Sequence, residues 1–265
     1  TALEDCEIEY DASAVRTNIK EYTASVVDMT KLTHDVMRVT LKLPNKDRIP
    51  FKAGQYINII LDDGQRRAFS FANPPHFGDI IELQIRLMPG GRFTTHVFEG
   101  MKVGDQVRFE GPVGDFTLRE SERPIVFVAG ATGFAPVKSM VEDAFRRGIK
   151  RQIHLYWGVK QLKDLYLPEL PQQWAKEHAN FHFIPVLSEP APEDNWSGRT
   201  GMVHEAILTD FPELKGHEIY ACGSVRMVEA IFPFLKAHGA EDGQCFSDAF
   251  TLSARSMAYQ PPLKQ

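Results

Sequence analysis

The hydrophobic pattern of this 265-residue chain changes its period once, near residue 118. Before that point, short segments alternate apolar and polar residues, which is typical of half-buried strands. After it, continuous apolar runs alternate with segments of helical period, which is typical of parallel strands connected by helices. This change indicates two folding units in one chain, an antiparallel β domain followed by an α/β domain.

The first half is predicted to form a small antiparallel β-barrel, because its short strands are separated by Gly, Asp and Pro turns. A sandwich of the same strands is the alternative. One short helix is expected within 94–100. The strands are predicted at residues 21–29, 36–43, 55–61, 80–88 and 105–111, together with the run that leaves the turn at 62–65 and stops at the prolines 74 and 75.

The second half is predicted to form a doubly wound parallel sheet, because its strands and helices alternate along the chain. Strands are expected at 123–130, 153–159, 181–188, 217–224 and 244–250. Helices are expected at 134–148, 167–178, 202–211 and 225–239. The fold class is therefore a β-barrel domain at 19–119 followed by an α/β domain at 120–250. The acidic residues 1–18 are interpreted as a linker and residues 251–265 as an exposed tail.

Composition argues against several classes of function. A net charge of −5 does not favour nucleic-acid binding. No apolar stretch approaches the roughly 20 residues of a membrane-spanning helix, and no secretory signal opens the chain. Three scattered cysteines do not make a disulfide framework, so the cytoplasm is the expected compartment. The histidines and cysteines lack metal-ligand spacing, so no metal site is expected on this chain.

Two glycine-rich turns are candidate phosphate sites. The sequence VFVAGATGFAPV (126–137) predicts a buried strand, a turn and a helix whose first amides could receive a phosphate. It has neither the G-x-G-x-x-G nor the Walker pattern, so a tight turn without a ligand is the alternative. The sequence MPGGRFTTHVFEG (88–100) offers exposed amides, Arg92 and a threonine expected to cap the helix. A hairpin turn before a capped helix is the alternative there.

Two further motifs carry chemical groups. The strand sequence YACGS (220–224) is expected to end at the crevice of the α/β sheet, where ligands bind. Its Cys222 is either a reactive thiol or a small buried residue. In RRAFSFANPP (66–75), Arg67 suits a phosphate, Phe69 suits a flat ring and Ser70 suits a ring nitrogen. These groups together fit a flavin dinucleotide, whereas a surface strand with a solvated arginine is the alternative.

Seven motifs occur in an order that resembles the ferredoxin–NADP reductase superfamily. They are RAFS, PGGRFTT, GPVGDF, AGATGFAP, YWGVK with DLYLPEL, YACGS and FSDAF. The resemblance covers about residues 20–250. It is strong for the reductase components of bacterial multicomponent oxygenases and the related CDP-6-deoxy-3,4-glucoseen reductases. Each motif alone is weak, but the series in register is specific.

The resemblance implies a role for each matching residue. FAD would contact the RAFS motif (Arg67, Ala68, Phe69 and Ser70), the strand backbone at Ile85, Arg86 and Leu87, and the turn of Gly90, Gly91, Arg92, Phe93 and Thr94. The nicotinamide dinucleotide would contact Gly130, Ala131, Thr132, Gly133, Pro136, Trp157, Gly158, Lys160, Glu189, Cys222, Gly223 and Ser224. Ser70, Cys222 and Phe250 would be the catalytic residues, with Phe250 as the aromatic ring over the second flavin face.

Three differences from these relatives affect the prediction. The chain lacks the C-x₄-C-x₂-C spacing of a plant-type [2Fe–2S] domain. Its acidic start resembles the connector that follows such a domain in these relatives. We therefore hypothesise that an N-terminal ferredoxin module is missing. The chain continues past Phe250, where Tyr259 could compete for the stacking role. Lys160 replaces a common arginine, but neighbouring acids favour a free ribose hydroxyl and therefore NADH over NADPH.

The resemblance implies an oxidoreductase that takes hydride from NADH onto FAD and passes single electrons to a [2Fe–2S] centre. That centre would lie on a missing domain or on a partner protein that serves an oxygenase or a related iron–sulfur enzyme. The alternatives are a free-flavin reductase and a non-catalytic flavin-binding sensor on the same scaffold.

Overall fold

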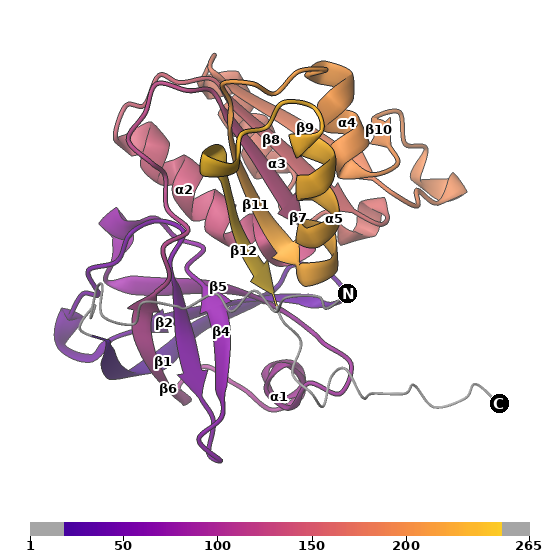
Figure 1. Ribbon diagram of the computed structural model, residues 1–265. Coiled ribbons are helices and arrows are strands. Elements are labelled where there is room, and N and C mark those ends of the chain that lie inside the picture. The colour runs from indigo at the N-terminus through magenta and orange to yellow at the C-terminus, as the bar shows by residue number, and fades with distance from the viewer. Residues whose placement is uncertain (1–18, 251–265) are drawn as a thin grey trace, which may run out of the picture.

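The structure, a computed structural model, describes residues 19–250 (Figure 1). The predictions for the linker at 1–18, the tail at 251–265 and Tyr259 lie outside the described residues. The described chain forms two six-stranded sheets, an antiparallel one followed by a parallel one. The predicted fold class is therefore confirmed. The exact boundary between the domains, placed at residues 119 and 120, stays a prediction.

The first sheet contains six antiparallel strands in the order β4-β3-β6-β1-β2-β5. Its two end strands approach each other, because the amide of Ala72, just after β4, donates to the carbonyl of Glu82 in β5 at 2.8 Å. This bond closes the curled sheet into a small barrel around an apolar core. The strands are β1 (Lys20–Lys31), β2 (Val36–Lys42), β3 (Tyr56–Ile60), β4 (Arg66–Ser70), β5 (Ile80–Arg86) and β6 (Gln106–Val113).

Alternation along these strands explains the barrel core. Ala24 and Val26 in β1 are buried, and so are Val39 and Leu41 in β2, with polar or partly exposed residues between them. Helix α1 (Arg92–Glu99) follows the glycine turn after β5. It begins two residues earlier than the predicted Thr94, because Gly91 takes the N-cap position. The predicted strand after residue 66 ends at Ser70, since the chain then leaves the sheet toward the two prolines.

The second sheet is parallel throughout, in the order β10-β9-β8-β7-β11-β12. Its strands are β7 (Ile125–Gly130), β8 (Ile153–Val159), β9 (Phe181–Leu187), β10 (Arg199–Thr200), β11 (Glu218–Ser224) and β12 (Cys245–Phe250). Its helices are α2 (Phe134–Arg146), α3 (Glu169–Glu177), α4 (Val203–Asp210) and α5 (Val225–Lys236). The sequence pattern missed β10, because two residues carry no periodicity.

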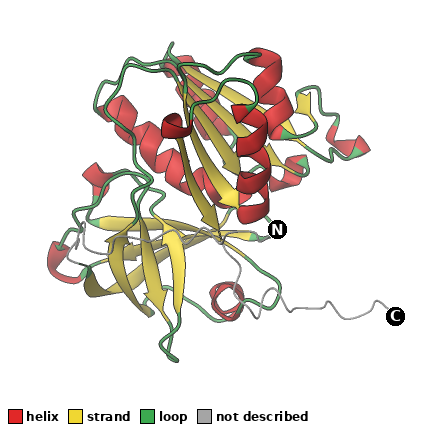
Figure 2. Ribbon diagram, viewed as in Figure 1, coloured by secondary structure: helices red, strands yellow, loops and turns green. Residues whose placement is uncertain are grey.

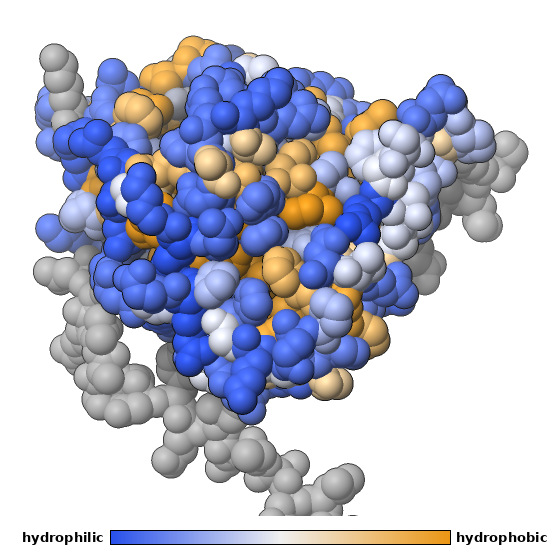
Figure 3. Space-filling view, turned by 90° about the horizontal axis from the view of Figure 1, so that it is seen from above, coloured by the Kyte–Doolittle hydropathy of each residue, from blue (hydrophilic) through white to orange (hydrophobic). Residues whose placement is uncertain are grey.

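Helices cover both faces of this sheet (Figure 2). Phe127 and Ala129 of β7 belong to the apolar cluster under α2 and α3, whereas Val126 and Val128 belong to the cluster under α4 and α5. Strand β7 is therefore buried on both faces of the sheet. This explains why all of its residues are apolar. Seen from above, the described surface is a mosaic of hydrophilic and hydrophobic areas (Figure 3).

The chain order of the sheet reverses between β7 and β11, which makes a topological switch point where their carboxyl ends meet. Helix α2 begins directly against this edge. A Cβ atom on Gly133 would lie 2.1 Å from the carbonyl oxygen of Cys222, so only glycine allows the helix to start so close to β11. In the described residues, no helix is both long enough and apolar enough to cross a membrane.

The remaining short elements are single 3-10 turns. They are η1 (Pro44–Lys46), η2 (Pro75–Phe77), η3 (Ala131–Gly133), η4 (Leu162–Asp164), η5 (Pro192–Asp194) and η6 (Asp242–Gln244).

Candidate active site between the two domains

A pocket of about 430 Å³ lies where the barrel meets the α/β domain. In Figure 1 the tip of β12 points down toward the barrel beside β4 and β5. The barrel contributes Tyr56, Asn58, Arg66, Arg67, Ala68, Phe69, Ser70, Gln84, Arg86, Met88, Gly91, Arg92, Phe93 and Thr94. The α/β domain contributes Thr132, Ala135, Asp248, Ala249 and Phe250. The site is thus built from both domains.

Strand β4 supplies one wall of the pocket, and the predicted RAFS residues all line it. The Phe69 ring packs against the Phe93 ring with centroids 5.4 Å apart and the planes tilted by 48°. Ser70 is buried, and its hydroxyl faces the α/β domain. The motif therefore presents an aromatic side chain, a hydroxyl and an arginine to one cavity.

Arg67 differs electrostatically from the other arginines of the pocket. Arg66, Arg86 and Arg92 form ion pairs with Glu110, Asp35 and Asp63 at 2.7, 2.7 and 2.8 Å, respectively. The Arg67 guanidinium donates instead to two neutral acceptors, the carbonyl of Arg66 at 2.7 Å and the side-chain oxygen of Gln65 at 2.6 Å. Within residues 19–250 its charge has no acidic partner, so it is suited to a phosphate.

The second glycine turn joins β5 to α1 and is braced from inside by Thr94. The Thr94 hydroxyl accepts from the amide of Met88 at 3.1 Å and donates to the carbonyl of Gly91 at 3.2 Å. The prediction that this threonine caps the helix is wrong, because Gly91 holds the N-cap position and Thr94 lies inside the first turn. Gly90 has φ +69°, a backbone conformation that favours glycine.

The end of β12 brings an unpredicted carboxylate into the pocket. The Ser70 hydroxyl donates to Asp248 Oδ2 at 3.5 Å, across 178 residues of sequence. Burial raises the pKa of Asp248 from 3.8 to about 6, and the negative charge of Asp115 contributes in the same direction. Sequence reasoning missed Asp248; its place in FSDAF, two residues before the selected Phe250, was the available signal. Phe250 lines the pocket, and its stacking over a flavin face stays a prediction.

The predicted nicotinamide residues lie around the switch point rather than in the pocket, apart from Thr132. Met227 lies over Gly130 and Gly223, because a Cβ atom on either glycine would approach the Met227 side chain within 3 Å. Cys222 is fully buried, and burial raises the pKa of its thiol well above the ordinary value. This raised pKa favours a neutral thiol over a reactive thiolate. Ser224 caps α5 by accepting from the amide of Met227 at 3.2 Å.

Other predicted residues support the turn or lie at its rim. Trp157 is fully buried, stacks on Phe134 with centroids 4.0 Å apart, and donates to the carbonyl of Ala131 at 2.9 Å. Ala131 has φ +47°, which is strained for a residue with a side chain. Pro136 is buried in the first turn of α2, and Gly158, the second-last residue of β8, pairs with Gly130 of β7. Lys160 and Glu189 are exposed and form an ion pair at 3.5 Å.

The residues predicted to contact FAD do not all point into the pocket. Arg86 lines it, whereas the Ile85 side chain lies in the barrel core. Leu87 follows β5, and its amide donates to the carbonyl of Asp35 at 2.7 Å. The features that do face the cavity fit a flavin dinucleotide, because an aromatic wall, an unneutralised arginine and a glycine turn match a flat ring joined to a pyrophosphate.

A barrel of this kind, joined to a doubly wound sheet with the site between them, defines a two-domain oxidoreductase that uses a flavin and a nicotinamide dinucleotide. Family models agree with this division. An oxidoreductase FAD-binding domain matches residues 23–118, and an oxidoreductase NAD-binding domain matches residues 127–232.

Comparison with individual proteins identifies the family to which this chain belongs. The chain is 39% identical over 249 residues to the CDP-6-deoxy-L-threo-D-glycero-4-hexulose-3-dehydrase reductase of Yersinia pestis, which covers 94% of this chain and 74% of that protein. It is 40% identical over 215 residues to a terephthalate 1,2-dioxygenase reductase component of a Comamonas species, covering 80% of this chain and 63% of that protein. The chain belongs to the ferredoxin–NADP reductase superfamily and is an FAD- and NAD(P)-dependent reductase.

Solved structures agree with this assignment. The reductase GcoB of Amycolatopsis superposes with a TM-score of 0.83 and 32% identity, over 88% of this chain and 71% of that one. A ferredoxin reductase of carbazole 1,9a-dioxygenase superposes with a TM-score of 0.78 and 26% identity, over 88% and 70%. The relatives are named for different systems that they reduce. Membership of the family therefore shows a reductase with an electron-accepting partner, but it does not identify that partner.

Proposed function

We propose that this protein takes hydride from NADH onto FAD and delivers single electrons to a [2Fe–2S] centre, on an attached domain or a partner protein, that serves an oxygenase or a related iron–sulfur enzyme. The observation that carries the proposal is the meeting of Ser70 from the barrel with Asp248 and Phe250 from the α/β domain in one pocket. A hydride can pass only where the two cofactor sites adjoin, and this pocket is built from both domains. The cytoplasm is the proposed compartment.

In this proposal FAD supplies the two-electron and one-electron chemistry, and the chain supplies position and proton handling. Arg67 and the amides of the Gly91 turn would hold the pyrophosphate. Phe69 and Phe250 would pack against the flavin ring, and the Ser70 hydroxyl would donate a hydrogen bond to it.

Asp248 is the proposed proton acceptor. Bound FAD would supply the redox chemistry, and the Ser70 hydroxyl would pass a proton released from the reduced cofactor to Asp248 Oδ2. The 3.5 Å distance between the two oxygens is long for such a bond, and catalytic hydrogen bonds often shorten when the ligand is bound. Cys222 would border the nicotinamide as a neutral thiol.

The preference for NADH is supported by charge at the exposed rim of the sheet. Lys160 is paired with Glu189, so its charge is partly neutralised. The Asp194 carboxylate lies close by and accepts from the amide of Leu162 at 3.2 Å. Two acids beside one lysine disfavour a 2′-phosphate and favour a free ribose hydroxyl.

Absorption spectra of the purified protein, before and after NADH and then NADPH, test the proposal. The protein should be yellow after gel filtration, bleach faster with NADH, and then reduce cytochrome c without added flavin. A non-catalytic sensor would bind flavin and fail to bleach. A free-flavin reductase would need added flavin for turnover. Iron analysis of the full-length gene product tests the attached [2Fe–2S] domain, and absence of iron would leave a separate partner as the acceptor.

A further inference from the structure

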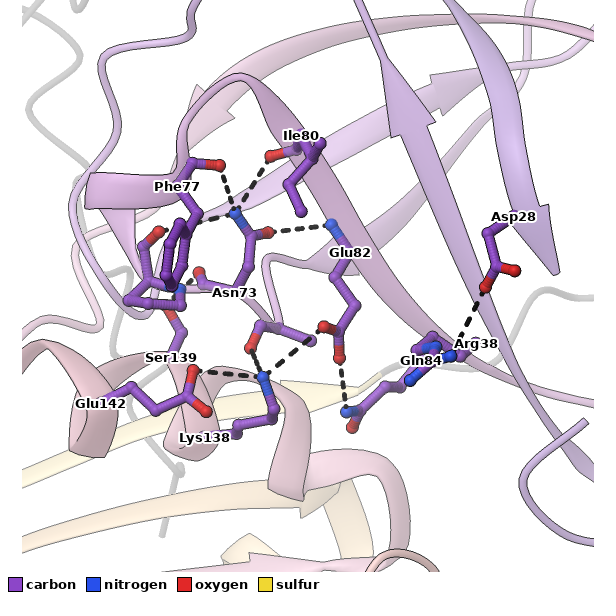
Figure 4. Close-up of polar contacts among 12 residues, drawn as sticks. Asp28, Arg38, Asn73, Phe77, Ile80, Glu82, Gln84, Lys138, Ser139 and Glu142 are labelled. Atoms are coloured by element: carbon purple, nitrogen blue, oxygen red, sulfur yellow. Dashed lines mark hydrogen bonds and ion pairs between the residues drawn. The ribbon is translucent and has the colours of Figure 1, made fainter. Parts of the chain in front are cut away.

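Two polar side chains of helix α2 reach across the domain boundary (Figure 4). Lys138, of which only 9% of the side chain is exposed, donates from Nζ to the carbonyl of Ala72 at 3.0 Å. Ser139, fully buried, donates from its hydroxyl to the carbonyl of Asn73 at 2.8 Å. The two acceptors are consecutive and lie directly after Ser70 and Phe71, so the end of the β4 wall is bonded to α2.

The segment that receives these bonds is itself fixed. The Asn73 side-chain amide donates to the carbonyls of Phe77 and Ile80 at 3.1 and 3.0 Å, and its oxygen accepts from the amide of Glu82 at 2.8 Å. Figure 4 shows this amide surrounded by its backbone partners, with Lys138 and Ser139 approaching from the helix. A displacement of α2 would therefore be transmitted to β4 and would not be absorbed by a loose loop.

Lys138 also lies between two carboxylates. Its Nζ is 3.1 Å from Glu142, one turn along the same helix, and 3.5 Å from Glu82 in the barrel. Burial raises the pKa of Glu142, and the ammonium of Lys138 opposes this effect. A buried ammonium that satisfies acceptors from both domains is costly to displace, because each partner would be left unpaired away from water.

The same network continues to the pocket. Glu82 accepts from the side-chain amide of Gln84 at 3.2 Å, and Gln84, which lines the pocket, accepts from the Tyr166 hydroxyl at 2.7 Å. Tyr166 is buried beneath the α/β sheet and packs edge-on against Trp157. The bond from Tyr166 to Gln84 is therefore a further link between the domains, and it ends at the cavity wall.

We propose that Lys138 is a positioning residue for hydride transfer, because it fixes the flavin-side wall of β4 against the helix that carries the nicotinamide-side turn. Thr132 of η3 and Ala135 of α2 line the pocket, and Lys138 follows Ala135 by one helical turn. The inference rests on the proposed function, since it concerns the distance between the two cofactor sites. Hydride transfer is far more sensitive to such a distance than outer-sphere electron transfer to a soluble acceptor is.

Stopped-flow measurement of the two half-reactions tests this role in the full chain. Lys138→Met should lower the rate of flavin reduction by NADH by about tenfold or more. The primary isotope effect with deuterated NADH should increase. FAD content should remain at the wild-type level, and reoxidation of the reduced enzyme by ferricyanide should stay within twofold. Ser139→Ala should shift flavin reduction in the same direction by a smaller factor, because it removes one neutral bond.

Glu142→Gln is the matched control, because it changes a partner on the same helix and leaves the bonds to Ala72 and Glu82 in place. It should match wild type in both half-reactions. Unchanged flavin reduction in both the Lys138 and Ser139 variants would overturn the positioning role, as would equal losses in both half-reactions together with loss of FAD. A wild-type protein that neither NADH nor NADPH reduces would overturn the proposed function itself. If Lys138→Met does not fold, the rate of flavin reduction in Ser139→Ala alone tests the positioning role.

Discussion

Replacement of Asp248 by asparagine removes a partly buried negative charge from the pocket and leaves the shape of the side chain nearly unchanged. Burial raises the pKa of Asp248 from 3.8 to about 6, so the folded protein resists ionisation of this group. The folded-state pKa is above the unfolded one, so the carboxyl costs no stability below pH 3.8. The cost grows as pH rises and is complete above the folded-state pKa.

The size of the effect follows from the shift. About two pKa units correspond to at most about 3 kcal/mol between the two protonation states. From the two pKa values, the penalty grows by about 1.4 kcal/mol between pH 5 and pH 8. Asp248→Asn removes that penalty, so the stability advantage of the variant should increase by about this amount over the same range.

Urea unfolding of the wild type and the variant at pH 5 and pH 8 measures this difference, with equal FAD saturation at each pH. A stability difference that does not change with pH would refute the reasoning, because it would show that Asp248 does not carry a raised pKa. The same substitution tests the proton role. Wild-type turnover with a one-electron acceptor should fall as pH decreases through about 6, since Asp248 must be ionised to accept a proton. The variant should be slower and should lack this transition.

Three other substitutions test the site and the packing beneath it. Arg67→Ala should lose FAD on gel filtration, because it removes the unneutralised cation of the pocket, and a mutant that stays yellow would contradict that role. Phe250→Ala should keep FAD and change nicotinamide affinity or the choice between NADH and NADPH; kinetics equal to wild type would count against it. Gly133→Ala should lower the free energy of unfolding by about 1–3 kcal/mol, because its Cβ would lie 2.1 Å from the Cys222 carbonyl. Gly243→Ala is its control in thermal unfolding, since nothing lies within 4 Å of the added atom, and equal losses would refute the packing argument.

Local motifs selected residues on the barrel side of the pocket and missed a carboxylate on the other side. Arg67 and Phe69 are two residues apart on one strand, so strand geometry places them on one face. Asp248 and Ser70 are 178 residues apart, and nothing in either segment states that they meet. The prediction for Thr94 failed for a different reason. A threonine near a helix start suggested an N-cap, but Gly91 is the N-cap residue, and the Thr94 hydroxyl instead donates to the Gly91 carbonyl within the turn.

The sequence by itself determined the two sheets, their type and their order, because hydrophobic period depends on which faces of a local segment are buried. It also determined the chemical types at the pocket wall, through motifs whose residues are close in the chain. Only the tertiary structure decided how the domains meet: that the end of β12 enters the barrel's pocket, and that Lys138 is buried between carboxylates of both domains. In the sequence, a lysine on an amphipathic helix resembles any solvated lysine. Its burial is set by the packing of a distant strand, which a local pattern cannot encode.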